Sequence, residues 1–455
     1  MKPLITLARQ LAAGDMTSVA LTEQCLERIA DQHGEGARAF IHVYADAARA
    51  AAQASDTLRA HGLVPSPLAG IPISVKDLFD IQGDTTRAGS VILRDAAPAH
   101  VDAPAIARLR AAGAIVIGRT NMTEFAYGAH GMNSHYGTPR NPWDRATGRI
   151  PGGSTSGGAV SVTDGMASAT IGSDTGGSVR IPAALCGLAG FKPTQARVPL
   201  AGAFPLSATR DSIGPLGVSA ACCIRLDAVM AHEEWPTSFE PPPLRGLRLG
   251  VPKTLVLDDL MPPVADAFAR ALTALSRQGA VIEEFDFQVL ADEAAGSKKA
   301  NFSSVEAYAL HRDWLATRAE EYDPYVYKRL VNGANMSAAD YYDLIRLRQR
   351  LIVEANRVTA RYDALLAPTV PIIAPTIAEM EADEKVFFRI NSLLLRNCAP
   401  FNVLDRPCWS LPCHRPGDAP VGLMVIGETM QDRRLQRLGL AIEAALSSAQ
   451  YGFDV

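Results

Sequence analysis

The sequence lacks the cysteine motifs that build metal or redox sites. Its seven cysteines are scattered, their number is odd, and none belongs to a Cys-x-x-Cys motif. This pattern argues against a zinc site and a disulfide framework and predicts reduced thiols in a cytoplasmic protein. We therefore expect no metal and no organic cofactor to depend on these cysteines.

Long apolar runs and strong charge are also missing. No stretch approaches the roughly 18 apolar residues of a membrane span. The N-terminal residues 1–18 have neither a long apolar segment nor a small-residue cleavage site, so we expect a short amphipathic helix there rather than a signal peptide. With a net charge of −4 and a pI near 6.2, the composition favours neither direct nucleic-acid binding nor a membrane partner.

What the sequence does contain is a regular alternation of strand and helix patterns. This rhythm predicts an α/β protein with a largely parallel sheet that helices cover on both faces. The proline-rich residues 233–246 are interpreted as a surface connection, because the rhythm resumes after them. The predicted helices are 17–32, 44–62, 264–278, 300–320 and 337–361, with a core-facing helix near the C-terminus, and the apolar run 68–76 is a predicted strand that ends at Lys76.

Two glycine-rich stretches, residues 150–160 and 172–182, combine paired glycines with serines and threonines. Neither is followed by the lysine of a phosphate-binding loop, and neither holds the Gly-x-Gly-x-x-Gly dinucleotide motif. Residues 153–157 place Thr155 where the α/β-hydrolase elbow requires serine. Two such stretches close together favour a functional site over ordinary connecting loops, and their hydroxyls indicate covalent catalysis by a serine.

A serine nucleophile needs a base, and the residues alone leave the base open. His130 and His135 lie near the glycine-rich region in a loop-like segment, but no acid pairs with them in a recognisable pattern. A buried lysine can also accept a proton, because burial disfavours its charged form. Lys76 and Lys192 both follow apolar residues and are the candidates, with a structural salt bridge as the alternative for each.

Four ordered motifs resemble the amidase signature family: "GIPISVKD", "PGGSTSGG", "GSDTGGSVRIPA" and "CGLAGFKPT". The resemblance is dense over about residues 68–215 and continues more weakly toward the C-terminus. It implies one large α/β/α domain over residues 1–455, with a mixed central β-sheet between two layers of helices. The catalytic core would span about 68–215, and a substrate-side helical region about 290–400.

The resemblance also implies a Ser-Ser-Lys catalytic triad. Its lysine corresponds to Lys76 rather than Lys192, its bridging serine to Ser154 and its nucleophile to Ser178, and the 24 positions between the two serines match the family. The peptide bond before the bridging serine, between Gly153 and Ser154, is expected to be cis. No metal and no cofactor is required by this chemistry.

The same resemblance assigns supporting roles. The backbone N–H groups of Thr175, Gly176, Gly177 and Ser178 are expected to form the oxyanion hole. Thr155 stands where a serine usually supports the hydrogen-bond network, so we expect an altered rate or substrate preference there.

Three further residues have open roles at this point. Asp174 and Arg180 flank the nucleophile and favour a structural ion pair over a role in substrate binding. Tyr127 matches a position that lines the acyl pocket in family members, although apolar packing is an equal interpretation.

The resemblance implies an amidohydrolase that cleaves the C–N bond of a small-molecule amide, through a serine acyl-enzyme, to a carboxylic acid and ammonia or an amine. The alternative is a glutamine-amidohydrolase subunit of a complex like the aminoacyl-tRNA amidotransferases, which would require partner chains. A third hypothesis, a binding protein without catalysis, is disfavoured by the intact Lys76, Ser154 and Ser178. The amide itself stays open, and so does the assembly state, with a homodimer as a candidate.

Overall fold

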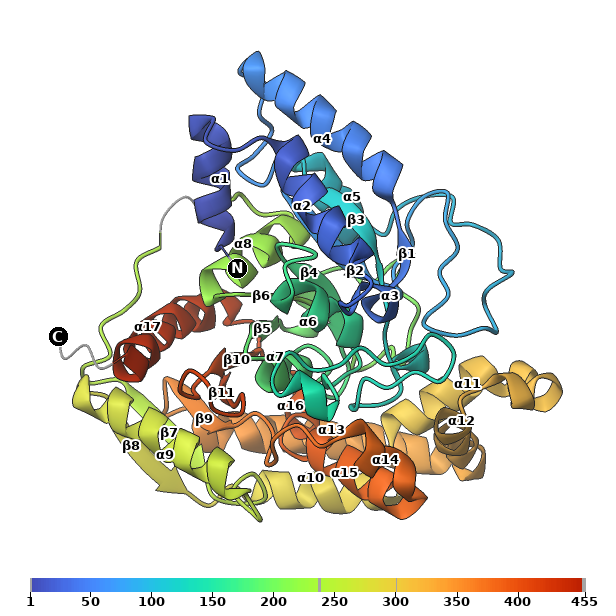
Figure 1. Ribbon diagram of the computed structural model, residues 1–455. Helices are drawn as coiled ribbons and strands as arrows, with labels where there is room; N and C mark the ends of the chain where they lie inside the picture. The colour runs from blue at the N-terminus through green and yellow to red at the C-terminus, as the bar shows by residue number, and fades with distance from the viewer. Residues whose placement is uncertain (1, 236–238, 300, 452–455) are drawn as a thin grey trace.

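The computed structural model describes residues 2–235, 239–299 and 301–451. Within these ranges one eleven-stranded sheet runs through the molecule in the order β1-β3-β2-β4-β6-β5-β10-β11-β9-β7-β8 (Figure 1). The strands are β1 Phe40–Val43, β2 Pro72–Lys76, β3 Ile115–Thr120, β4 Thr170–Asp174, β5 Ala189–Lys192, β6 Ser212–Gly217, β7 Arg248–Pro252, β8 Val281–Phe285, β9 Ala364–Pro368, β10 Cys408–Pro412 and β11 Gly422–Ile426.

The sheet is mixed, as the family resemblance implies, and the expectation of a largely parallel sheet is wrong. Strand β2 is parallel to β3 and β4, and β7 is parallel to β8 and β9. The strands between these two groups pair antiparallel. The reason is the connections: residues 413–421 join β10 to β11 as a hairpin, and residues 193–211 join β5 to β6 without a crossing α-helix. Such connections return the chain in the opposite direction.

Helices pack on both faces of the sheet. They are α1 Leu4–Ala13, α2 Ser18–Ala30, α3 Gly36–Ala39, α4 Ala45–Ala60, α5 Pro104–Ala111, α6 Ser156–Thr163, α7 Arg180–Cys186, α8 Ala220–Met230, α9 Pro262–Arg277, α10 Gln288–Lys299, α11 Phe302–Thr317, α12 Pro324–Val331, α13 Ala338–Thr359, α14 Ile377–Ala382, α15 Glu384–Arg396, α16 Ala399–Val403 and α17 Asp432–Tyr451. No helix in the described part of the chain is long and apolar enough to cross a bilayer.

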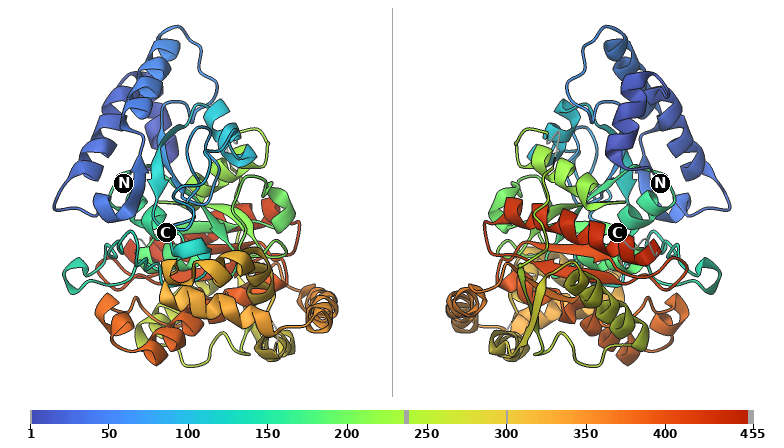
Figure 2. Two further views of the ribbon diagram at one scale, coloured as in Figure 1. Left: turned by 90° about the vertical axis from the view of Figure 1, so that its right-hand side faces the viewer. Right: turned by 90° about the vertical axis from the view of Figure 1, so that its left-hand side faces the viewer.

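Alternating side chains of the strands fill separate cores. On β9, Leu365 and Ala367 pack with α7, α13 and α15, whereas Ala364 and Leu366 pack on the opposite face with α8, α9 and α17. A strand buried on both faces has a continuous apolar sequence, which explains the unbroken apolar pattern of this segment. The helices α1, α2 and α4 gather at one end of the molecule, and α10–α15 at the other (Figures 1 and 2).

The helix boundaries follow local capping chemistry. Thr17 caps α2 by accepting a hydrogen bond from the backbone N–H of Ala20, as the pattern at residues 17–32 predicts. Ser337 begins α13 with a capping box to Asp340. The predicted helices 44–62, 264–278 and 337–361 are therefore confirmed as α4, α9 and α13, and 300–320 contains α11.

The stretch 233–246 connects β6 and α8 to β7, and residues 236–238 within it lie outside the described residues. Strand β7 joins the same sheet as β6. The sheet therefore continues across this stretch, and the interpretation that 233–246 is a surface connection within one domain of residues 1–455 stays a prediction.

Candidate active site

Lys76 is the last residue of β2 and is completely buried. Its Nζ lies 2.7 Å from the Oγ of Ser154 and 2.8 Å from the Oγ of Ser173. Ser173 belongs to β4, which is the parallel neighbour of β2. The carboxyl ends of adjacent parallel strands thus bring a lysine and a serine together, a common location for functional sites in α/β proteins.

The hydrogen-bond partners of Lys76 are hydroxyls rather than carboxylates. Burial lowers the pKa of Lys76 to about 7, and the fields of Asp174 and Asp211 oppose that effect only in part. A lysine with this pKa is substantially uncharged at neutral pH, and the neutral amine has a lone pair that accepts a proton.

Ser154 sits in a tightly packed loop before α6. The peptide bond between Gly153 and Ser154 is cis, as predicted. A Cβ at Gly153 would lie 2.5 Å from the backbone nitrogen of Gly131, so this position has room only for glycine. The Ser154 carbonyl accepts a hydrogen bond from Thr123 N, and Gly153 N donates to Ala129 O. Neighbouring backbone therefore holds the Ser154 hydroxyl beside Lys76.

Ser178 lies in the turn between β4 and α7 and is 4% exposed. The Oγ1 of Thr155 donates to its carbonyl at 2.6 Å, so a hydrogen bond joins the two glycine-rich stretches directly. Among the described residues, no hydrogen bond joins the Ser178 hydroxyl to that of Ser154. The structure therefore places Lys76 and Ser154 in contact and holds Ser178 beside them through its backbone and Thr155.

Asp174 and Arg180 form the predicted ion pair. The Nη2 of Arg180 lies 2.9 Å from the Oδ1 of Asp174, and both side chains are fully buried. Burial alone would raise the pKa of the Asp174 carboxyl, but the Arg180 guanidinium holds it below its ordinary value. The carboxylate also accepts hydrogen bonds from the backbone N–H groups of Gly177 and Val179. The pair thereby shapes the turn that carries Ser178.

This arrangement differs from the predicted oxyanion hole at one residue. The N–H of Gly177 donates to Asp174 at 2.8 Å and is therefore engaged by the protein itself. Gly177 has φ of +131°, and a Cβ there would lie 2.5 Å from the Cδ1 of Ile181. Its role is to let the chain turn, and the N–H groups of Thr175, Gly176 and Ser178 remain as candidates.

Asp211 supports the same turn and was not predicted. The Oγ1 of Thr175 donates to its carboxylate at 2.5 Å, and the backbone N–H groups of Leu206 and Ser207 donate to the other oxygen. Burial raises the pKa of Asp211 to about 6. Asp211 directly precedes β6, the antiparallel neighbour of β4, so only the strand pairing brings it to Thr175.

The other candidate bases have different partners. His130 is buried, its Nδ1 accepts from the N–H of Met132, and burial lowers its pKa to about 3. His135 bonds to Glu124 at 2.9 Å. The Nζ of Lys192 donates to its neighbour Pro193 O, not to a serine hydroxyl.

Tyr127 is buried where η1 Glu124–Ala126 ends, and its contacts reach the helical region. Its hydroxyl lies 2.9 Å from the Oγ of Ser304 on α11, and the guanidinium of Arg329 on α12 stands 4.1 Å above its ring. Arg329 also donates to the Tyr127 carbonyl. These contacts give Tyr127 a packing role, and a place in the acyl pocket stays a prediction.

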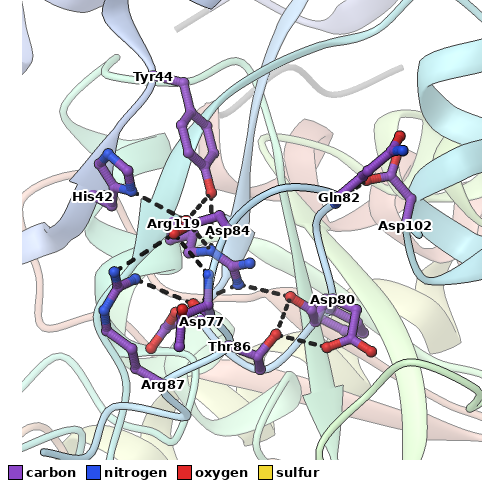
Figure 3. A network of polar contacts seen from close by, with 12 residues as sticks. His42, Tyr44, Asp77, Asp80, Gln82, Asp84, Thr86, Arg87, Asp102 and Arg119 are labelled. Atoms are coloured by element: carbon purple, nitrogen blue, oxygen red, sulfur yellow. Dashed lines mark hydrogen bonds and ion pairs between the residues drawn. The ribbon is translucent and has the colours of Figure 1, made fainter. Parts of the chain in front are cut away.

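One residue after Lys76, Asp77 belongs to a different polar cluster (Figure 3). Arg119 lies 3.5 Å from Asp77 and 2.7 Å from Asp84, and Tyr44 donates to Asp84 at 2.6 Å. Burial raises the pKa of Asp77 to about 6 even though Arg119 opposes it. This cluster joins β1, β2 and β3 to the loop after β2. No serine hydroxyl in it lies next to a lysine, so it is separate from the Lys76 site.

Sequence reasoning missed Ser173 and Asn402 as members of the buried network. Ser173 lies in the second glycine-rich stretch, and this position close to Ser178 in the sequence could have marked it as a candidate. Its hydrogen bond to Lys76, however, depends on the pairing of β4 with β2. Asn402 on α16 donates to Asp174 and accepts from Arg180. It lies more than 200 residues away along the chain, and nothing in the local pattern distinguishes it.

The structure thus places a buried lysine in hydrogen-bond contact with two serine hydroxyls at the carboxyl edge of a mixed sheet. The family model described as Amidase matches residues 20–435 of this chain. The protein therefore belongs to the amidase signature family, whose members are hydrolases that act on the C–N bonds of amides.

Curated and solved relatives agree with this membership. A glutamyl-tRNA(Gln) amidotransferase subunit of Chloroflexus aggregans is 34% identical over 95% of this chain and 94% of its own length. A crystal structure of an amidase superposes with a TM-score of 0.87 at 34% identity and covers 97% of this chain and 99% of that one. The corresponding glutamyl-tRNA(Gln) amidotransferase subunit of Thermotoga maritima gives a TM-score of 0.74 at 29% identity, covering 94% and 91%.

Proposed function

We propose that the protein hydrolyses a small-molecule amide to a carboxylic acid and ammonia or an amine, through an acyl-enzyme on Ser178. The observation that carries this proposal is the contact between the Lys76 amine and the Ser154 hydroxyl, in a site where burial brings the lysine pKa to about 7. Lys76 is then the base, Ser154 the relay and Ser178 the nucleophile.

The steps follow from these positions. Neutral Lys76 accepts the proton of Ser154 while Ser154 takes that of Ser178, whose Oγ turns toward it and bonds to the amide carbon. The carbonyl oxygen becomes an anion held by the N–H groups of Thr175, Gly176 and Ser178, each worth about 2.7–4 kcal/mol in such sites. The C–N bond then breaks, and the proton on Lys76 passes through Ser154 to the leaving nitrogen. Water attacks the ester by the same relay and releases the acid.

A fluorophosphonate probe tests the nucleophile directly, because it modifies only an activated serine. The wild-type protein should be labelled, and Ser178→Ala should abolish the labelling. Ser156→Ala is the matched control: it removes a buried hydroxyl of the first glycine-rich stretch whose nearest acceptor, Asn121 O, lies at 3.5 Å. Labelling that persists in Ser178→Ala, or its absence from a folded wild-type protein, contradicts the proposal.

A second candidate function is supported by the curated relatives. Those named above are subunits of glutamyl-tRNA(Gln) amidotransferases, and the identity of 34% extends over 95% of the chain. On this alternative the chain releases ammonia from glutamine and works with partner subunits. The solved amidase is the nearer fold match, with a TM-score of 0.87 against 0.74 for the Thermotoga protein.

Ammonia release by the purified chain separates the two functions. A stand-alone amidase turns over members of a panel of aryl and aliphatic amides without partners. An amidotransferase subunit is selective for glutamine and gains activity when partner subunits are added. Chromatographic mass measurement of the same preparation determines whether the active form is a monomer or a homodimer.

A further inference from the structure

Arg210 is a buried arginine that the catalytic proposal does not use. It lies two residues before β6, which pairs antiparallel with β4 in the register Asp174↔Ser212. Continuing that register by two residues places Arg210 opposite Gly176. The side chain is consistent with this: its Nη2 lies 3.8 Å from the Cβ position that Gly176 leaves empty. The guanidinium therefore stands beside the segment proposed to hold the substrate's carbonyl oxygen.

The guanidinium of Arg210 makes little use of its donors. The residue is 6% exposed. Its Nη2 donates to the carbonyl of Ala399 at 3.3 Å, and its Nε has no hydrogen-bond partner among the described residues. Burying a charge without an ionic partner is costly, so buried charges in native proteins are usually paired.

Two other buried arginines of this protein have carboxylate partners. Arg180 pairs with Asp174, and Arg119 with Asp77 and Asp84. Arg225, which is 4% exposed, stacks on the ring of Phe239 at 4.5 Å. The carboxylates offset the cost of burying Arg180 and Arg119, whereas Arg225, like Arg210, has an Nε without a hydrogen-bond partner among the described residues.

Three carboxylates exert a field on Arg210 without serving as its hydrogen-bond partners. Burial and, to a smaller degree, Arg348 lower the pKa of Arg210, while Glu293, Glu306 and Asp211 act to raise it. Glu293 accepts from the hydroxyl of Ser297. Glu306 accepts from Thr209 and Tyr341. Asp211 accepts from the hydroxyl of Thr175. All three carboxylates are thus bonded to hydroxyls, and no carboxylate of the described residues occupies the guanidinium of Arg210.

We infer that Arg210 binds a carboxylate of the substrate, so that the preferred substrates are amides that also carry a carboxylate group. A guanidinium presents parallel N–H donors that match the two oxygens of a carboxylate, which fixes the substrate's orientation as well as its charge. Because Arg210 stands beside Gly176, it anchors the substrate next to the carbonyl to be attacked. This inference rests on the proposed amidase function and names its substrate class.

The test compares anionic and neutral substrates of equal length. The monoamides of malonic, succinic and glutaric acids are assayed against the corresponding diamides, by ammonia release. Wild type should favour the best monoamide over its diamide by about 10- to 100-fold in kcat/KM, the range of a charged hydrogen bond. Arg210→Met should reduce this ratio by the same factor, mainly through KM, and Arg210→Lys should restore part of it.

Arg225→Met is the matched control, because it removes an equally buried arginine outside the site and should leave the ratio unchanged. A binding measurement adds a readout that needs no turnover: malonate, succinate or glutarate should raise the Tm of wild type and not that of Arg210→Met. A ratio near one in wild type, or a diacid effect that persists in Arg210→Met, overturns the inference. Fluorophosphonate labelling of Ser178 in the same samples shows separately whether the proposed amidase function holds.

Discussion

Lys76 and Asp77 are consecutive residues at the end of β2, yet their side chains enter two different buried clusters. Lys76 bonds to the hydroxyls of Ser154 and Ser173. Asp77 contacts the guanidinium of Arg119, which also holds Asp84. Successive side chains of a strand point to opposite faces, so one residue step separates a lysine without a carboxylate partner from a network of paired charges.

The two clusters differ in how their buried charges are compensated. Around Asp77, opposite charges compensate one another, and the network joins β1, β2 and β3 (Figure 3). Around Lys76, hydroxyls accept the amine's hydrogen bonds but cannot neutralise an ammonium, so the proton is held weakly and the pKa falls to about 7. The paired charges around Asp77 stabilise the fold, whereas the unpaired Lys76 amine is the base of the proposed mechanism.

Replacing Lys76 with methionine should break this comparison most strongly. Methionine keeps the apolar stem and removes the base, so we expect kcat to fall by about 10²- to 10⁴-fold, the usual contribution of general base catalysis. The fold should persist, as judged by circular dichroism and Tm. Lys192→Met is the control, because that buried amine bonds to a backbone carbonyl, and it should retain activity. Full turnover by Lys76→Met contradicts the assignment.

Arg119→Met should have the second-largest effect, on stability rather than on catalysis. It leaves the buried Asp77 without its guanidinium partner and removes the shortest ion pair of Asp84, which costs about 3–5 kcal/mol in the free energy of unfolding. Urea denaturation measures the loss. Arg110→Met is the control: its pair with Asp102 is partly exposed and should contribute less than about 1 kcal/mol. If kcat of Arg119→Met falls strongly at urea concentrations at which the variant is still folded, the two clusters are coupled and the comparison fails.

The pH dependence of kcat/KM is the next effect in size, about tenfold per pH unit. Neutral Lys76 is the active form, so kcat/KM should be flat above its pKa of about 7 and fall about tenfold per unit below it. Ser173→Ala removes an acceptor that favours the ammonium, which lowers the pKa and moves the acidic limb to lower pH. A flat wild-type profile from pH 5 to 9, or a limb that moves upward in Ser173→Ala, contradicts the role of Lys76.

Thr155→Ser should have the smallest effect. Serine keeps the donor to the Ser178 carbonyl but loses a methyl group that packs beside Gly158 and Gly172. We expect a loss of about 1 kcal/mol in unfolding free energy and only a few-fold change in kcat. Thr155→Val keeps the shape and removes the hydroxyl, so it should reduce kcat more than Thr155→Ser does. The opposite order would show that the methyl group, not the hydrogen bond, positions Ser178.

Several features of the site were predictable and others were not. The motifs pointed to Lys76, Ser154 and the ion pair of Asp174 with Arg180, because each stands in a short stretch with its own spacing. The direction of the strands was not predictable, since apolar periodicity is the same in parallel and antiparallel strands. The bond that engages Gly177 escaped notice because it depends on where the Asp174 carboxylate turns.

Residue chemistry and spacing along the chain pointed to a serine nucleophile in the glycine-rich stretches and to a buried lysine as one candidate base, and the resemblance to the amidase signature family selected Lys76, Ser154 and Ser178 from the candidates. The hydrogen-bond partners of those groups depended on the tertiary structure. Ser173 reaches Lys76 through parallel strands, Asp211 reaches Thr175 through antiparallel ones, and Arg210 lies beside Gly176 by the same register. A pKa depends on burial and on every neighbouring charge, and both exist only once distant segments have packed together.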